Sequence, residues 1–309
     1  MKNSHKYIYM LGVVSIAMTG CSTKKQTLIV PTGTPSLGAA TFLKENKNKI
    51  EANIVAGAEQ LGPAFASKSY DIIIAPVTLG AKMYNANQNY ICYKTVVWGN
   101  FYFASTKEIT SLSDLAGKSI TFFGENTTPS IIASAVLKSN NLFDSVEITY
   151  VNDVSTANEY LMNNDINCDY ILTAEPSLSI LKSKNTIYSI DLQEEWNKIT
   201  SVGSYPQAAI FANKDLLDDE KYVKTLDSLV ASYQNATEEK KTDVATAAIE
   251  IDPNFSSFKP NLLANALPNC HFGINEDEKE AMEFYFNKLI EMNYGAQIGA
   301  KLPDEGFYH

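Results

Sequence analysis

The sequence has 309 residues, 45% of them hydrophobic, and carries a formal net charge of −10. This length can bury the cores of two domains or lobes, and the acidic balance argues against a nucleic acid as the partner. All 25 basic residues are Lys, because the sequence contains no Arg. An anionic ligand would therefore have to be held by Lys, backbone N–H groups or hydroxyls, without the two-point contact of a guanidinium group.

The chain begins with the pattern of an export signal. Two lysines among the first six residues precede an apolar run over residues 7–18, which is too short to span a bilayer as a helix. A glycine and then Cys21 follow, an arrangement that resembles a bacterial lipobox. The resemblance implies a lipoprotein signal peptide over residues 1–21 and acyl chains, palmitate among them, that anchor the mature protein through Cys21. Residues 22–27 are expected to be a polar tether.

Cysteine and histidine are too scarce to suggest a metal site or an acid–base mechanism. Apart from Cys21, the cysteines are Cys92, Cys168 and Cys270, which form no C-x-x-C pair and show no metal-site spacing. Cys270 precedes His271, but adjacent residues do not face each other on a helix. We therefore expect no metal, no cofactor and no catalytic residue.

Strands and helices alternate through the first part of the mature chain. Apolar runs rich in β-branched residues predict strands over residues 27–31, 50–55, 71–76, 90–97 and 100–105. Helical spacing of apolar residues predicts helices over residues 37–44, 58–67 and 77–85. This order predicts a mostly parallel sheet with right-handed crossovers. Ligands bind beyond the carboxyl ends of such strands, so the turns there are candidate binding loops; the alternative is that they are only turns.

The next eighty residues repeat this alternation. Strands are predicted over residues 119–123, 146–151, 170–173 and 186–192, and helices over residues 130–139, 155–163 and 178–184. Thr128 and Pro129 are a suitable cap and first helical residue for the helix that follows. The loops over residues 124–128 and 173–176 again follow strands. Two such units facing each other would form a cleft.

The remainder is mainly helical. A strand is predicted over residues 207–212, and helices over residues 216–235, 237–249, 259–266 and 275–293. In the last helix, Met282, Phe286, Leu289 and Ile290 share one stripe, which is more typical of a core face than of a cofactor site.

Taken together, the pattern resembles the periplasmic-binding-protein-like type II fold, in the group of ABC transporter solute receptors for taurine, alkanesulfonates, nitrate and the thiamine pyrimidine. The resemblance covers nearly the whole mature chain and rests on Pro35 and on residues 71–76, 111–118, 170–176 and 205–209. It implies an α/β fold of two βαβ lobes with a hinge and a ligand cleft between the lobes.

The lobe boundaries follow from this resemblance. Lobe 1 is expected to comprise residues 28–105 and 205–309, and lobe 2 residues 106–204. The hinges are expected near 105–106 and 204–205.

The function implied is that of a monomeric, membrane-anchored solute-binding subunit of an importer on the outer face of a bacterial cell membrane. Its partners would be a small-molecule ligand and the ABC permease and ATPase subunits. Two alternatives stay open: an enzyme on the same fold, and a surface sensor or adhesin. The scarcity of histidine and the lack of a nucleophile–base pair argue against the enzyme, since one conspicuous acid, Glu175, does not make a mechanism.

We expect the cleft to be lined by Thr34, Pro35, Val77, Thr78, Trp98, Asn100, Asn126, Thr127, Thr128, Glu175, Tyr205 and Gln207. Hydroxyl and amide groups would form hydrogen bonds, and Trp98 and Tyr205 would provide stacking faces. With these aromatic residues and no Arg, a small heterocycle or vitamin precursor is favoured over a sulfonate or nitrate.

Overall fold

The computed structural model describes residues 25–163, 167–201, 204–273, 275 and 277–309. The predicted signal peptide, Cys21 and residues 22–24 of the predicted tether lie outside these residues. Gln26 and Thr27, which the prediction included in the tether, belong instead to the first strand. None of the helices in the described part of the chain is long and apolar enough to span a membrane.

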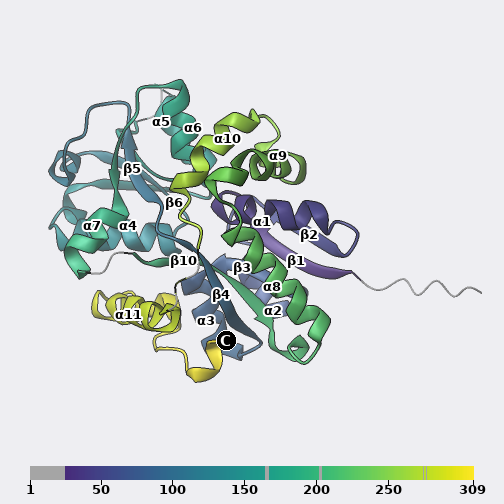
Figure 1. Ribbon diagram of the computed structural model, residues 1–309. Coiled ribbons are helices and arrows are strands. Elements are labelled where there is room, and N and C mark those ends of the chain that lie inside the picture. The colour runs from purple at the N-terminus through teal and green to yellow at the C-terminus, as the bar shows by residue number, and fades with distance from the viewer. Residues whose placement is uncertain (1–24, 164–166, 202–203, 274, 276) are drawn as a thin grey trace, which may run out of the picture.

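Two five-stranded sheets form the centres of two lobes (Figure 1). The sheet of lobe 1 has the order β2-β1-β3-β10-β4, and its strands are β1 (Gln26–Pro31), β2 (Ile50–Val55), β3 (Ile72–Pro76), β4 (Tyr90–Trp98) and β10 (Pro206–Asn213). The sheet of lobe 2 has the order β7-β6-β8-β5-β9, and its strands are β5 (Phe101–Ser105), β6 (Ser119–Phe123), β7 (Glu147–Val151), β8 (Tyr170–Ala174) and β9 (Tyr188–Asp191).

Both sheets are mixed: in each, four strands run in one direction, as expected for a mostly parallel sheet, and one strand runs against them. In lobe 1, β1 runs parallel to β2 and β3, whereas β10 is antiparallel to β3 and β4. In lobe 2, β6 runs parallel to β7 and β8, whereas β5 is antiparallel to β8 and β9. The strand that runs against the others is β10 in lobe 1 and β5 in lobe 2, and local periodicity does not reveal the direction of either strand.

The first crossing between the lobes lies at Gly99 and Asn100. The sequence placed residues 100–105 in lobe 1 and a hinge at 105–106, but β5 pairs with β8 and β9 in lobe 2. Gly99 and Asn100 have φ angles of 66° and 77°, and this left-handed turn separates β4 from β5. The Gly99 N–H donates to the Tyr205 carbonyl at 3.0 Å, so the outward and return crossings lie side by side.

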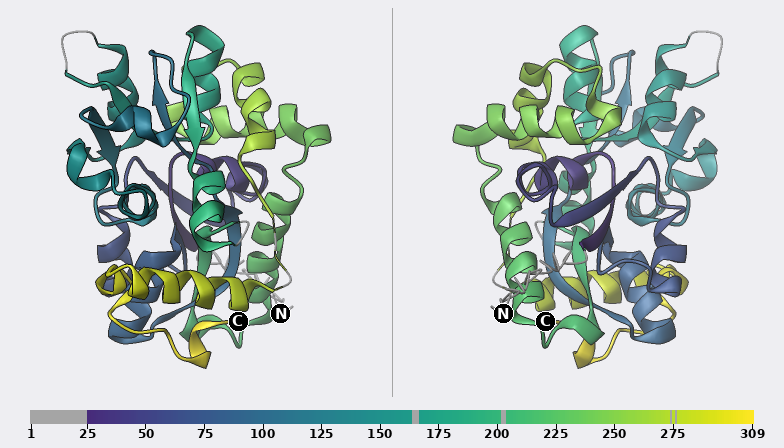
Figure 2. Two further views of the ribbon diagram at one scale, coloured as in Figure 1. Left: turned by 90° about the vertical axis from the view of Figure 1, so that its left-hand side faces the viewer. Right: turned by 90° about the vertical axis from the view of Figure 1, so that its right-hand side faces the viewer.

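Helices cover the sheets of both lobes, as Figure 2 shows from two sides. Those of lobe 1 are α1 (Thr34–Glu45), α2 (Leu61–Ser67), α3 (Val77–Asn87), α8 (Glu220–Gln234), α9 (Lys241–Ile251), α10 (Pro260–Ala266) and α11 (Glu278–Glu291). Those of lobe 2 are α4 (Thr128–Ser139), α5 (Val154–Met162), α6 (Ser177–Lys184) and α7 (Leu192–Thr200). The sequence analysis missed α7, which Asp191 caps by accepting from the N–H groups of Gln193 and Glu194.

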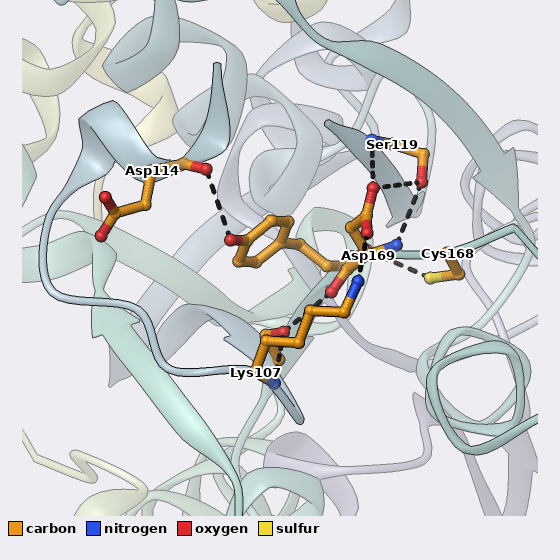
Figure 3. A network of polar contacts seen from close by, with 7 residues as sticks. Lys107, Asp114, Ser119, Cys168 and Asp169 are labelled. Carbon is orange, nitrogen blue, oxygen red and sulfur yellow. Dashed lines mark hydrogen bonds and ion pairs between the residues drawn. The ribbon is translucent and has the colours of Figure 1, made fainter. Parts of the chain in front are cut away.

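One polar clamp holds the end of each sheet that lies away from the cleft described below. In lobe 2, Asp169 Oδ2 accepts from the N–H and the hydroxyl of Ser119, both at 3.2 Å, and Lys107 pairs with Asp169 at 2.8 Å (Figure 3). The 111–118 segment, one carrier of the resemblance, lies at this end, where Asp114 caps the turn through the N–H groups of Thr110 and Ser111. Its role is therefore structural.

Candidate functional site

A cleft lies between the lobes, at the carboxyl ends of β1, β2 and β3 in lobe 1 and of β6, β7 and β8 in lobe 2. Its volume is about 110 Å³. Lobe 1 lines it with residues 31–35, 56–58, 76 and 207–208, and lobe 2 with residues 101, 123–124, 127–129, 152–154 and 174–175. This is the place where open α/β sheets bind ligands.

Two copies of the sequence Thr-Pro-Ser face the cleft, one from each lobe. The first begins α1 as residues 34–36, and the second begins α4 as residues 128–130. Proline suits the first helical turn because its missing N–H would have no intrahelical partner there. Neither helix has a side-chain N-cap. The first N–H groups of each helix therefore remain available to a polar ligand atom, with the positive end of the helix dipole behind them.

Hydrogen bonds join the two lobes across the cleft. The hydroxyl of Thr34 in lobe 1 donates to the carbonyl oxygen of Glu175 in lobe 2 at 2.5 Å. The hydroxyls of Thr78 and Thr128 lie 3.2 Å apart and form a second link. At one rim, the amide of Gln297 donates to Asn126 Oδ1 at 3.1 Å. The structure is therefore a closed arrangement of the lobes.

The cleft has two carboxylates and no basic side chain among its lining residues. Glu175 is 4% exposed, and burial raises the pKa of its carboxyl group, which accepts from the Ser179 N–H at 3.1 Å and from the Ser179 hydroxyl at 3.0 Å. Asp153 caps α5 by accepting from the Thr156 N–H at 2.9 Å. Each carboxylate thus offsets the dipole of a helix in its own lobe.

The structure places six of the twelve predicted site residues in the lining, namely Thr34, Pro35, Thr127, Thr128, Glu175 and Gln207. Gln207 is 8% exposed, and its Oε1 has no hydrogen-bond partner in the described structure. Val77, Thr78 and Asn126 lie beside the lining, where Val77 is buried.

Trp98 and Tyr205 do not present stacking faces to the cleft. The Trp98 indole N–H donates to the Gly273 carbonyl at 3.2 Å, and the side chain is 9% exposed. Tyr205 is fully buried, stacks on Phe101 with ring centroids 5.9 Å apart, and contacts Trp196 and Tyr285. The expected stacking roles are thus corrected, because the Tyr205 ring packs against other aromatic rings and the Trp98 side chain is directed to Gly273.

Asn100 acts at the crossing rather than in the lining. It is fully buried, and its amide donates to the Thr34 hydroxyl at 3.1 Å and to the Cys270 carbonyl at 3.2 Å. Asn100, whose backbone has the left-handed conformation, therefore orients Thr34, a lining residue at the start of α1. Burial raises the pKa of the neighbouring Cys270 thiol well above its ordinary value, which keeps the thiol protonated.

Several lining residues escaped the sequence analysis. Phe101 and Phe123 are the lining aromatic residues, with ring centroids 6.2 Å apart and planes at 70°. The segments 56–58 and 152–154 follow β2 and β7, equivalent strands of the two lobes. The repeated Thr-Pro-Ser sequence was the available signal for an equivalence between the lobes. In the described residues, no group of three or more His, Cys, Asp and Glu side chains could hold a metal ion.

Comparisons with known proteins agree with this geometry. Residues 92–242 match a family model described as NMT1/THI5 like. No curated protein sequence matches this chain. Among solved structures, an ABC transporter protein from Parabacteroides distasonis is 19% identical with a TM-score of 0.71, over 92% of this chain and 98% of that one.

Two sulfonate-binding proteins are also similar in structure. The aliphatic sulphonate binding protein SsuA from Escherichia coli is 12% identical with a TM-score of 0.68, over 91% of this chain and 96% of that one. The alkanesulfonate-binding protein SsuA from Xanthomonas axonopodis pv. citri, bound to MOPS, is 11% identical with a TM-score of 0.67, over 92% and 98%. The chain therefore has the type II periplasmic-binding-protein fold, and its residues 92–242 match the NMT1/THI5-like family.

Proposed function

We propose that this protein is the solute-binding subunit of an ABC-type importer, held on the outer face of the cell membrane by lipid on Cys21. The observation that carries the proposal is the cleft between the two lobes, which hydrogen bonds span at two points. Thr34 of lobe 1 donates to the carbonyl of Glu175, and Thr128 of lobe 2 pairs with Thr78. A ligand between the lobes would stabilise the closed form, and permease and ATPase subunits would receive the loaded protein.

The adjacent crossings support a hinge motion. The outward crossing at Gly99 and Asn100 and the return crossing at Tyr205 lie in hydrogen-bond contact. Domain closure around ligands commonly uses a few such residues at the ends of strands. The named structural neighbours are ABC transporter and sulfonate-binding proteins, which favours a receptor over an enzyme on the same fold or a surface sensor or adhesin.

The lining favours a small solute without net negative charge, such as a heterocycle or vitamin precursor, over a sulfonate or nitrate. No Lys lines the cleft, and both of its acids are carboxylates that cap helices of lobe 2. An anion would depend on the backbone N–H groups at the starts of α1 and α4 and on neutral hydroxyl and amide groups of the lining, with no positive side chain beside it. The cavity of about 110 Å³ is below the roughly 300–1,000 Å³ of drug-sized sites, and Phe101 and Phe123 provide apolar walls.

A thermal-shift screen of the mature chain, with Cys21 replaced by Ser, tests the receptor function. The protein is unfolded and refolded to remove any copurified ligand, and is then mixed with pyrimidines, vitamins, amino acids, alkanesulfonates and nitrate. A ligand that binds only the native state raises the melting temperature with the logarithm of its concentration. A saturable shift with an uncharged compound is expected. A shift with ethanesulfonate or MOPS alone would contradict the proposed ligand class, and no shift with any class would count against the receptor.

A pair of glutamine variants shows whether binding occurs in the cleft. Gln207→Ala removes a buried lining amide, and binding of the panel compound should weaken about fivefold to tenfold, as the loss of one hydrogen bond implies. Gln234→Ala changes an exposed residue at the end of α8 and should leave binding unchanged. Equal affinities of the two variants would place the ligand elsewhere.

The lipid anchor is tested separately in cells. The full-length chain should incorporate a clickable palmitate analogue and sediment with membranes, and Cys21→Ala should abolish both. Label that persists in Cys21→Ala would contradict the anchor and leave the cleft unaffected.

A further inference from the structure

A fully buried carboxylate lies behind the cleft loop of lobe 1. Asp252 is the single residue between α9 and the short helix η5 (Pro253–Phe255), and its side chain is 0% exposed. Its Oδ2 accepts from the hydroxyls of Thr32 and Ser36, both at 2.7 Å. Its Oδ1 accepts from the N–H and the side-chain amide of Asn254, both at 2.9 Å. Four donors thus compensate the burial of this group.

The two hydroxyls belong to the two ends of the loop that lines the cleft. Thr32 follows β1, Ser36 is in the first turn of α1, and the residues between them line the cleft. Gly33 has a φ of 102°, a conformation that favours glycine, and its carbonyl accepts from the Ser36 hydroxyl at 3.2 Å. Asp252, which does not line the cleft, therefore holds the loop through the hydroxyls at its two ends.

The helices next to Asp252 contact both lobes. In one apolar cluster, α9 and α10 pack with Leu37 of α1 in lobe 1 and with Ile180 of α6 in lobe 2. Asn269, just after α10, donates to the Ser179 hydroxyl of α6 at 3.4 Å. Figure 1 shows α10 beside α6 and α9 beside α1. Asp252 thus joins the cleft loop to a helix pair that also contacts lobe 2.

We infer that Asp252 is a positioning residue: it holds the 32–36 loop in its ligand-binding geometry and couples that loop to the α6–α10 contact made when the lobes close. Asp252 itself touches no ligand. The inference rests on the proposed receptor function. The coupling of the 32–36 loop to the α6–α10 contact can nevertheless be measured without a ligand.

Hydrogen–deuterium exchange on the ligand-free mature chain tests this role. Asp252→Asn replaces an acceptor oxygen by an NH₂ group that faces donors, and Thr32→Val removes one of those donors. Both should raise exchange of the amides of residues 33–40 about tenfold, as expected for the loss of a hydrogen bond to a charged acceptor. Thr32→Ser keeps the hydroxyl and Asp243→Asn lies exposed on α9, so both should exchange like the wild type. Unchanged exchange in Asp252→Asn, or an equal rise over both lobes, would overturn the inference.

A double-mutant cycle tests the coupling. Ile180→Ala weakens the contact of α6 with the α9–α10 pair and should raise exchange in residues 33–40 when Asp252 is present. In the Asp252→Asn background the same change should have little further effect, because the connection is already broken. Additive effects would show that loop and contact are independent.

Binding provides the final comparison. Any compound of the screening panel that binds the wild type should bind Asp252→Asn about tenfold more weakly and Asp243→Asn normally. The exchange experiments need no ligand. An unsuccessful screen would therefore count against the receptor function, whereas the role of Asp252 would still be decided by the exchange measurements. Normal binding by Asp252→Asn would overturn that role and leave the receptor function intact.

Discussion

The sheets of the two lobes share one strand order, β2-β1-β3-β10-β4 in lobe 1 and β7-β6-β8-β5-β9 in lobe 2. The polar clamp at the far end of each sheet is also shared. Asp71 Oδ2 accepts from the N–H of Thr27 at 2.8 Å and from its hydroxyl at 3.2 Å, as Asp169 Oδ2 does from Ser119. Equivalent Thr-Pro-Ser sequences begin α1 and α4.

The lobes differ in what holds these two helix starts. In lobe 2, the hydroxyl of Ser130 donates to the carbonyls of Gly124 and Thr127 at 2.9 and 3.1 Å, so the loop is closed by its own backbone. In lobe 1, the equivalent Ser36 has the same local contact, 3.2 Å to the Gly33 carbonyl, but it also donates at 2.7 Å to Asp252, which lies 216 residues away in sequence. Both loops therefore have a local hydrogen bond, and that of lobe 1 is held in addition by a residue of the C-terminal helical region.

The largest effects should come from the central strands, where the two lobes are alike. Ile74 in β3 and Leu172 in β8 are both fully buried. Ile74→Ala and Leu172→Ala should each lower the free energy of unfolding by about 2–5 kcal/mol, because each leaves a cavity in a core. Urea unfolding measures both. A loss in one lobe several times that in the other would show that the shared strand order does not imply equal packing.

The paired serines distinguish the two loops. Ser36→Ala removes a buried hydrogen bond to a carboxylate, and we expect a loss of about 2 kcal/mol of unfolding free energy. Ser130→Ala removes hydrogen bonds to neutral carbonyls and should cost about 1 kcal/mol. The same urea titrations suffice. A larger loss in Ser130→Ala would reverse the comparison.

The strands of both lobes could be predicted from the sequence, because a short continuous apolar run such as residues 71–76 is typical of a buried strand. It also placed the cleft at the strand ends, and Thr34, Thr128 and Gln207 lie in the lining. These predictions depend on local pattern and on the general rule for open sheets.

What the sequence did not predict are the long-range features. The aromatic run of β5 indicates a strand but not its sheet, and so the hinge was misplaced by about six residues. Trp98 and Tyr205 lie outside the lining, since local spacing does not determine which side of a strand end faces the cleft. The bond from Asp252 to Thr32 spans 220 residues, and nothing local marks it.

Replacing the carboxylate of either polar clamp should lower the free energy of unfolding by a similar amount at neutral pH. Asp71→Asn and Asp169→Asn each weaken two or more hydrogen bonds to a partly exposed carboxylate, so we expect losses of about 1–2 kcal/mol after allowance for solvent screening. Urea unfolding at pH 7 provides the comparison. A negligible loss in either variant would mean that the clamp of that lobe does not stabilise its sheet.

The pH dependence of the lobe 2 clamp has a definite sign. The hydrogen bond from Lys107, with those from Ser119, holds the pKa of Asp169 below its usual range. The stabilisation is therefore fully present above the unfolded value of about 3.9 and is lost as the pH falls through the lower folded value. Asp169→Asn should lose less stability than the wild type between pH 5 and pH 2. Parallel curves for the two proteins would contradict this assignment.

The smallest effect should come from Lys107, the part of the clamp that lobe 1 does not share. Lys107 pairs with Asp169 at 2.8 Å, but its side chain is 69% exposed; within the described residues, Asp71 has no ion pair. An exposed pair contributes little and is screened by salt, so Lys107→Ala should lower the melting temperature by about 2 °C or less at low ionic strength and not at all in about 1 M NaCl. Lys68→Ala, which removes the exposed pair with Asp215, is the matched control in lobe 1. A salt-resistant loss confined to Lys107→Ala would mean that this lysine positions Asp169 for Ser119, and the clamps of the two lobes would then differ in mechanism as well as in composition.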